Sequence, residues 1–294
     1  MPERVLVTGP YGFAGNHLRK ELGEPSFPFE GDILDPISLM TTVRDVRPIA
    51  VVHLAARFSV AGSWGGVAEV WRTNVLGTAN VVDAVRLEAP AARMLFVSSG
   101  EVYGCARRIA TPEEAPVEPV SPYGASKAAA ELVCAQAGRE LDIVVARSFL
   151  HVGPGQDERF AVGSWAAQLA RLRRRGGGVL KVGDLNVERD LTGVRDVCRA
   201  YRLLLQPTVP AGTYNVASGR LVPLRRVLES LVAFAAVPIT VEREKARLRR
   251  AEVALMAGDT SKLCAATDWC PTIPLERSLQ ETLVAATVAD AVAS

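Results

Sequence analysis

The sequence lacks an excess of charge of either sign. Lysine and arginine together number 34 against 32 aspartates and glutamates, which gives a formal net charge of +2. This balance argues against the strongly basic surfaces of proteins that bind nucleic acid or anionic membranes. No apolar run approaches the ~18 residues that cross a bilayer, and Val5–Val7 is too short for a signal peptide. We therefore expect no nucleic-acid partner, no membrane partner, and a cytoplasmic location.

Cysteine and histidine are also scarce. The five cysteines lie at positions 105, 134, 198, 264 and 270, and none of them forms a CxxC pair. An odd number of isolated cysteines predicts neither a disulfide framework nor a zinc ribbon. The three histidines, His17, His53 and His151, are widely separated in the chain. The sequence therefore predicts no metal site built by the protein.

Short apolar runs alternate with helical stretches in the first half of the chain. The 294 residues, 49% hydrophobic and 22% charged, can bury the core of one large domain or two modest ones. Continuous apolar strands separated by helices are typical of a parallel sheet covered on both faces. The predicted fold class is α/β, with a Rossmann-type doubly wound parallel sheet. Predicted strands are Arg4–Thr8, Ile49–Leu54, Met94–Val97 and Ile143–Ala146, and predicted helices are Phe13–Leu22, Val67–Arg86 and Tyr123–Ala137.

The alternation weakens after about residue 150, where glycine-rich stretches interrupt the pattern. We expect residues 1–150 to form a dinucleotide-binding domain, to which some later segments return. Residues 151–294 are expected to form mainly a smaller α/β substrate lobe. No linker separates the two parts, so we expect them to share a cleft. In this half, strands are predicted at Val179–Val182 and Thr213–Val216, and helices at Pro223–Ala236 and Leu275–Val292.

A glycine-rich turn follows the first predicted strand and opens the first helix. Gly9 permits a tight turn, Gly12 allows the backbone to approach a pyrophosphate, and Gly15 allows the helix to pack closely on the strand. The free amides of the helix N-terminus favour phosphate there. The alternative is a tight turn without a ligand. We predict a nicotinamide dinucleotide cofactor, with Phe13 and Ala14 as further contacts.

The second strand, within residues 23–30, contains two prolines and is predicted to be short and edge-like. An acidic residue at the end of this strand favours NAD, whereas a nearby arginine suits NADP. Glu30 is the candidate, but so short a strand does not place it. The sequence therefore leaves the choice between NAD and NADP open.

A tyrosine and a lysine four residues apart follow Pro122, a residue suited to the first turn of a helix. On that helix Tyr123 and Lys127 share one face. A phenol titrates near ~10, and a neighbouring ammonium together with a positively charged nicotinamide favours the phenolate. Tyr123 is thus a candidate acid or base, and Lys127 a candidate contact for the nicotinamide ribose. The alternative is a solvated helix face.

An apolar strand ends in two serines just before this helix. Residues at the C-terminal ends of strands line the ligand crevice of open α/β sheets. Ser99 there could donate a hydrogen bond to a substrate carbonyl. Glu101 is a further catalytic candidate, for which a capping or solvated role is the alternative.

These motifs resemble the extended short-chain dehydrogenase/reductases that act on nucleotide sugars, the NAD-dependent epimerase/dehydratase family. The resemblance covers nearly the whole chain, and within the family it is greatest to GDP-4-keto-6-deoxy-D-mannose reductases, which make GDP-D-rhamnose. It implies a Rossmann domain with a C-terminal substrate lobe. The motifs include TGPYGFAG (8–15), GDILD (31–35), VVHLAA (51–56), NVLGTANV (74–81), SSGEVYG (98–104), SPYGASK (121–127), FLHVGPGQ (149–156) and RRAEV (249–253).

The resemblance also implies roles for individual residues. Ser99, Tyr123 and Lys127 match the catalytic triad of the family. Cofactor contacts are implied for Asp32 and Ile33 beside the adenine and for Leu54, Ala55 and Ala56 at a strand end. Substrate contacts are implied for Phe149, His151, Arg189 and Arg249. Arginine suits nucleotide binding because its planar fork holds phosphate oxygens in pairs.

Two departures from the family pattern bear on the reaction. Dehydratases carry an Asp-Glu pair after the serine or threonine, but here Gly100 precedes Glu101. Leu150 stands where the family usually has asparagine. We predict NAD(P)-dependent reduction of a nucleotide-linked 4-keto-6-deoxy sugar, with GDP favoured as the nucleotide. Nucleotide-sugar epimerase is the alternative, and a dehydratase or a non-catalytic dinucleotide-binding regulator is less favoured. Relatives pair the helices at 67–86 and 123–137 in dimers, so a homodimer is expected.

Overall fold

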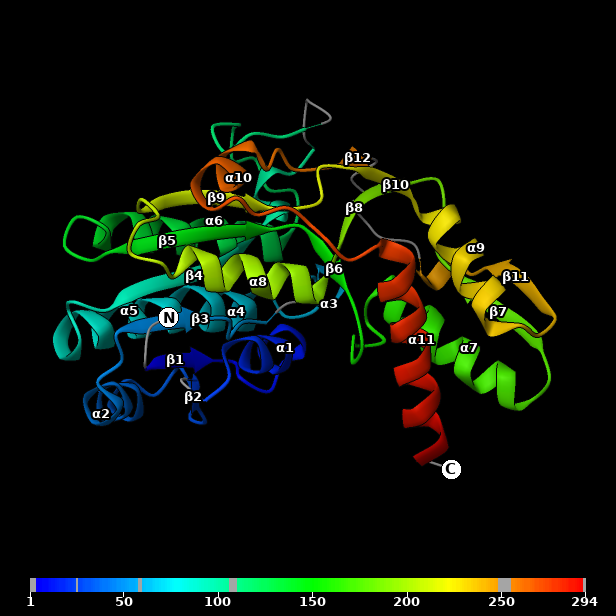
Figure 1. The fold of residues 1–294 in the computed structure, drawn as a ribbon, viewed down its shortest axis with the longest axis horizontal. Helices are drawn as coiled ribbons and strands as arrows, with labels where there is room; N and C mark the ends of the chain where they lie inside the picture. Colours follow the sequence, from blue (N-terminus) through cyan, green and yellow to red (C-terminus); the bar gives the residue numbers. More distant parts are fainter. Residues whose placement is uncertain (1–3, 25, 58–59, 106–109, 248–254, 293–294) are drawn as a thin grey trace.

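The central element of the structure is a six-stranded parallel sheet (Figure 1). This computed structural model describes residues 4–24, 26–57, 60–105, 110–247 and 255–292. The strand order is β2-β1-β3-β4-β5-β9, and every neighbouring pair is parallel. The bounds are β1 Val5–Thr8, β2 Ser26–Phe29, β3 Ala50–His53, β4 Arg93–Ser99, β5 Ile143–Ser148 and β9 Gly212–Val216. The sheet confirms the predicted fold class.

Helices cover both faces of the sheet, which explains why its central strands are continuous apolar runs. One face packs against α1 (Phe13–Leu22) and α8 (Val194–Leu204). The other face packs against α2 (Pro36–Val46), α5 (Gly77–Glu88) and α6 (Pro122–Ala137). Successive residues of a strand point to opposite faces, so β1 contributes Leu6 to one core and Val5 and Val7 to the other.

The second strand is short and lies at the edge of the sheet, as its prolines predict. Among the described strands, β2 pairs only with β1. A central strand forms hydrogen bonds to neighbours on both sides, and Pro28 has no amide hydrogen to donate. An edge position accommodates it, because the strand there has only one neighbour.

Five of the described helices were not predicted. The first, α2, begins at an Asp35-Pro36 pair in which the Asp35 carboxylate accepts hydrogen bonds from the amides of Ile37 and Ser38. An N-capping acid followed by proline is a recognisable start signal. The others are the short α3 (Val60–Ser63) and, in the second half of the chain, α7 (Ala161–Arg174), α8 and α10 (Ser261–Thr267).

The helical segment predicted at residues 67–86 is interrupted by a π-turn. It consists of α4 (Val67–Trp71), a π-helical turn at Arg72–Leu76, and α5. The wider turn carries Asn74, whose side chain is buried at 1% exposure. Single π-turns of this kind often occur at functional sites.

The second lobe has its own core beside the sheet (Figure 1). Its mixed sheet has the order β10-β8-β12 with β6 also paired to β8, and a separate parallel pair joins β7 and β11. Helices α7, α9 and α11 pack on one another. In contrast, β9, α8 and α10 from the second half of the chain join the large sheet. The bounds are β6 Leu150–Val152, β7 Gly178–Val182, β8 Glu188–Gly193, β10 Leu221–Pro223, β11 Ile239–Arg243, β12 Leu255–Met256, α9 Leu224–Ala235, α10 Ser261–Thr267 and α11 Leu275–Val292.

The remaining described elements are short. They are α3 (Val60–Ser63) and two 3-10 turns, at Gly100–Tyr103 and Lys245–Arg247. None of the helices in the described ranges is long and apolar enough to cross a membrane.

Candidate active site

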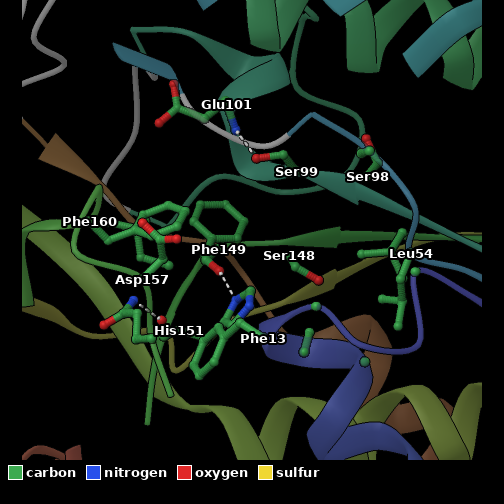
Figure 2. Close-up of a pocket in the computed structure, with 18 of the residues that line it drawn as sticks. Phe13, Leu54, Ser98, Ser99, Glu101, Ser148, Phe149, His151, Asp157 and Phe160 are labelled. Atoms are coloured by element: carbon green, nitrogen blue, oxygen red, sulfur yellow. Dashed lines mark hydrogen bonds between the residues drawn. The ribbon is translucent and has the colours of Figure 1, made fainter. Parts of the chain in front are cut away.

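A pocket of about 500 Å³ opens at the C-terminal ends of β1, β4 and β5. In doubly wound folds this end of the strands is where ligands bind. Figure 2 shows Ser99 and Glu101 on one side of the pocket and Phe13 and His151 on the opposite side. The pocket brings together thirteen residues singled out from the sequence: Gly9, Gly12, Phe13, Ala14, Gly15, Leu54, Ala56, Ser99, Glu101, Tyr123, Lys127, Phe149 and His151.

The glycine-rich turn has the geometry of a phosphate cradle. Gly9 has φ +69°, and a β-carbon there would lie 2.8 Å from the backbone nitrogen of Ala55. A β-carbon on Gly15 would lie 2.2 Å from the carbonyl oxygen of Gly9. Both positions therefore require glycine. The helix that starts at Phe13 directs its free amides into the pocket, so these residues fit the diphosphate of a dinucleotide.

Tyr123 and Ser99 meet above this turn although they come from different elements. Tyr123 lies in the first turn of α6, which begins with the N-cap Ser121 and Pro122. Ser99 ends β4, and its side chain is hydrogen-bonded to that of Tyr123. The Ser99 hydroxyl also accepts a hydrogen bond from the amide of Glu101 at 3.2 Å. A phenol and a hydroxyl thus lie together in the lining of one pocket.

Lys127 lies one helical turn after Tyr123 and is buried at 3% exposure. Its ammonium donates a hydrogen bond to the carbonyl oxygen of Val97 at 2.7 Å and lies 4.8 Å from the ring centre of Phe96. Burial lowers the pKa of Lys127 to about 8. The side chain lines the pocket, where it can reach the hydroxyls of a bound ribose.

The pKa of Tyr123 is governed mainly by burial. Burial raises the pKa of Tyr123 above the ordinary value of a phenol, the Ser99 hydrogen bond opposes this, and the Glu101 charge adds to it. A raised pKa favours the protonated phenol, the form that a proton donor needs. The phenolate was expected with a positively charged nicotinamide bound nearby, and that expectation stays a prediction.

Aromatic side chains form the wall opposite the serines. The Phe13 and His151 rings are stacked, with centres 5.6 Å apart. The His151 Nδ1 lies 3.1 Å from the Phe149 carbonyl oxygen (Figure 2), and burial lowers the pKa of His151 below its usual value. A neutral ring that donates through Nδ1 leaves Nε2 as an acceptor. Asp157 and Phe160 complete this side.

Several predicted site residues lie away from the pocket lining. Ile33 packs in the core beneath α5, and the Asp32 carboxylate accepts a hydrogen bond from the amide of Leu34 at 2.9 Å. Ala55 contributes its backbone beneath Gly9 rather than a pocket surface. The Arg189 side chain is buried at 3% exposure and donates to the carbonyl oxygen of Glu188. Arg249 lies outside the described residues.

Asn74 is a supporting residue that sequence reasoning did not single out. Its amide group accepts from the amide of Arg57 at 2.7 Å and donates to the Arg57 carbonyl and to the Ser126 hydroxyl. Ser126 in turn donates to the carbonyl oxygen of Tyr123. Asn74 therefore connects the loop after β3 to the first turn of α6, which carries Tyr123. The motif NVLGTANV begins with this residue and was the available signal.

A buried ion pair supports the helix behind Lys127. The Arg147 guanidinium donates two-pronged hydrogen bonds to Glu131, and the two side chains are 8% and 11% exposed. Ser98 donates to the same carboxylate, and Arg147 also donates to the Tyr103 hydroxyl at 2.9 Å. This network ties α6 to the ends of β4 and β5. No group of three metal-ligating side chains occurs within the described ranges.

Comparisons with known proteins agree with this site. A family model described as GDP-mannose 4,6 dehydratase matches residues 16–282. The GDP-6-deoxy-D-mannose reductase of Pseudomonas aeruginosa is 36% identical over 295 residues, covering 96% of this chain and 97% of that protein. The chain belongs to the GDP-mannose 4,6-dehydratase family. The predicted family resemblance is therefore confirmed.

Solved structures extend the likeness to the whole chain. The RMD protein of Pseudomonas aeruginosa complexed with NADPH has a TM-score of 0.88 at 35% identity, and 98% of this chain and 99% of that one are covered. The UDP-glucose 4-epimerase of Thermus thermophilus complexed with NAD has a TM-score of 0.84 at 27% identity, with 96% and 98% covered. The chain is thus an NAD(P)-dependent nucleotide-sugar oxidoreductase of the short-chain type, as its motifs predict.

Proposed function

We propose that this protein reduces the 4-keto group of a nucleotide-linked 4-keto-6-deoxy sugar. GDP-4-keto-6-deoxy-D-mannose is the proposed substrate, and GDP-D-rhamnose is the product. The observation that carries this proposal is the convergence of the Tyr123 and Ser99 hydroxyls beside the Lys127 ammonium in one pocket. The 36% identity to a GDP-6-deoxy-D-mannose reductase supports the choice of sugar.

The proposed chemistry assigns one task to each side chain. A reduced nicotinamide supplies the hydride when it is bound. Ser99 donates a hydrogen bond to the substrate carbonyl and polarises it. Tyr123 gives its phenolic proton to the same oxygen as negative charge develops, which its raised pKa permits because the proton is present at neutral pH. A positioned acid of this kind contributes roughly 10²–10⁴-fold to the rate. Lys127 holds ribose hydroxyls, and its positive charge favours the phenolate that forms as the proton leaves.

Reduction is favoured over dehydration by the residue that precedes Glu101. Loss of water from the sugar needs a second acid, and Gly100 supplies none. Reduction needs one hydride and one proton, and Tyr123 alone can supply the proton. The acid at Glu101 is half-buried at the pocket rim and is compatible with reduction.

The test is turnover of purified protein with GDP-4-keto-6-deoxy-D-mannose and reduced dinucleotide. We expect loss of the absorbance of reduced nicotinamide, with one GDP-D-rhamnose formed per hydride. The Tyr123→Phe variant should bind dinucleotide as the wild type does and lose most turnover. Sugar isomerisation without net consumption of dinucleotide would identify an epimerase instead. Dinucleotide binding without any turnover of keto sugars would favour a regulator.

We also propose that the protein forms a homodimer through α4, the following π-turn and α6. These elements pack side by side and expose large apolar side chains. Leu132 on α6 is 73% exposed, and Val67, Trp71 and Leu76 are exposed on the neighbouring segment. A Leu132→Glu variant should sediment as a monomer, whereas the wild type should sediment as a dimer. Sedimentation of the wild type as a monomer would overturn this proposal.

We propose further that residues 1–150, with α8 and β9, bind the dinucleotide and that residues 151–294 mainly bind the sugar nucleotide. The position of the pocket, between strand ends and residues 151–160, supports this division.

A cytoplasmic location is proposed because Cys105, Cys264 and Cys270 are free and exposed, a state that a reducing compartment preserves.

A further inference from the structure

His17 lies on α1, one turn after Phe13, and is not among the residues that line the pocket. Its Nε2 is 2.8 Å from the carbonyl oxygen of Pro154. A carbonyl oxygen only accepts hydrogen bonds, so Nε2 is the donor. Burial lowers the pKa of His17 below its ordinary value, which favours the neutral ring. This hydrogen bond joins the helix of the phosphate cradle to the chain just after β6, at the side of the large sheet that faces the second lobe (Figure 1).

The segment that this bond holds, residues 153–160, forms one wall of the pocket. It begins at Gly153, where an added β-carbon would lie 2.5 Å from a methyl carbon of Val194 and 3.7 Å from the Phe13 ring. The start of the segment is therefore packed against both α8 and α1. The members that line the pocket are Gly155, Gln156, Asp157, Arg159 and Phe160.

Ring contacts connect the same two parts of the chain. The Phe13 ring is edge-on to His17, with ring centres 5.6 Å apart, and it is stacked on His151 of β6 at the same distance (Figure 2). The position of this wall relative to the glycine-rich turn is thus set by side chains of α1.

Gln156 indicates what the wall is able to bind. Its Nε2 donates to the carbonyl oxygen of His151 at 2.8 Å, whereas its buried Oε1 accepts no hydrogen bond from the residues that the structure describes. A buried acceptor of this kind calls for a donor from elsewhere. The hydroxyls of a sugar are such donors, which supports the placement of the sugar against this wall.

We propose that His17 is a positioning residue for the sugar nucleotide, although it lies on the helix that begins at the dinucleotide turn. Its hydrogen bond to Pro154 fixes the wall of residues 153–160 against which the sugar binds. The inference rests on the proposed function, because it takes the ligand of this wall to be a nucleotide-linked sugar. The turn glycines and helix amides that fit the diphosphate do not depend on this bond. Loss of the bond should therefore weaken binding of the sugar nucleotide and spare binding of the dinucleotide.

The test compares His17→Leu with His17→Gln in the full chain. Leucine keeps an apolar contact with Phe13 but cannot donate, whereas the amide of glutamine can donate to the same carbonyl. Calorimetric titration with GDP-mannose, which has no 4-keto group, and with reduced dinucleotide gives the two affinities. We expect His17→Leu to weaken GDP-mannose binding roughly three- to tenfold, as for the loss of one hydrogen bond, and to leave dinucleotide affinity unchanged. The KM for the keto sugar should rise with little change in kcat, and His17→Gln should restore the wild-type values.

Two further variants make the test specific. Lys20→Met, at an exposed residue of the same helix, should change neither affinity. His17→Asn, whose amide is one methylene too short to replace Nε2, should behave as His17→Leu does, so a folding defect peculiar to leucine is recognised.

Three results would overturn the inference. They are unchanged GDP-mannose binding in His17→Leu and His17→Asn, equal weakening of both ligands in these variants, and failure of His17→Gln to restore binding. Wild-type protein that binds dinucleotide but neither GDP-mannose nor the keto sugar would contradict the proposed function itself, and this inference with it. The wild type therefore tests the function, and the variants test the role of His17.

Discussion

A β-carbon on Gly100 would lie 3.0 Å from the ring of Phe149. The ring is 4% exposed, and a β-carbon on Gly258 would lie 2.6 Å from another part of its edge. Phe149 therefore occupies a space that exists because both neighbours lack side chains. A side chain at position 100, where dehydratases carry an acid, would therefore require the Phe149 ring to shift.

Gly100→Ala is expected to destabilise the protein by about 1–3 kcal/mol, because the added methyl group overpacks the contact with Phe149. Urea unfolding measures the change. Gly66→Ala is the matched control, since a β-carbon at Gly66 meets nothing within 4 Å. Equal effects of the two substitutions would contradict the prediction. Adding Phe149→Leu to Gly100→Ala should recover part of the lost stability.

Asn74→Ala should lower the free energy of unfolding by about 2–3 kcal/mol, since it removes three hydrogen bonds of a buried amide, two to the Arg57 backbone and one to the Ser126 hydroxyl. It should also weaken dinucleotide binding, because the loop after β3 loses its anchor beside the pocket. Calorimetric unfolding and dinucleotide titration give the two values. Asn186→Ala, at an exposed asparagine, should change neither. Wild-type affinity in Asn74→Ala would exclude the anchoring role.

Arg147→Met is expected to cost about 3–5 kcal/mol, because it leaves the buried carboxylate of Glu131 without its cation. The double variant Arg147→Met with Glu131→Leu should be more stable than Arg147→Met alone, since the unpaired charge is then absent. A double-mutant cycle measured by urea unfolding tests this. The exposed Arg226–Glu229 pair provides the comparison, and its loss should cost under about 1 kcal/mol. The prediction would be refuted if the changes in unfolding free energy of the two single variants added up to that of the double variant.

Acid should destabilise the protein partly through His53, which lies buried between Thr8 and Thr78. Burial lowers the pKa of His53 from 6.5 to about 3. The unfolded chain therefore takes up a proton between pH 6.5 and 3 that the native protein does not. Stability falls as the pH falls through this window, by up to about 1.4 kcal/mol per pH unit. His53→Gln should show a shallower loss over the same range, and parallel curves for the two proteins would count against this assignment.

The sequence alone predicted those elements that are determined by residues close together in the chain. The helix predicted at Phe13–Leu22 has the same bounds in the structure, because the glycine turn starts it and Gly23 ends it. The four-residue spacing of Tyr123 and Lys127 places both in one pocket for the same local reason. Helix α2 was missed although its Asp35-Pro36 start signal is equally local.

Contacts between distant segments could not be inferred in this way. Nothing in the order of residues indicates that Phe149 fits between Gly100 and Gly258, or that Tyr11 reaches Glu30. The raised pKa of Tyr123 likewise depends on burial by several elements at once. Periodicity and turn residues determine the backbone conformation over a few neighbouring residues. Packing, desolvation and charge pairing arise only when the folded chain brings remote side chains together.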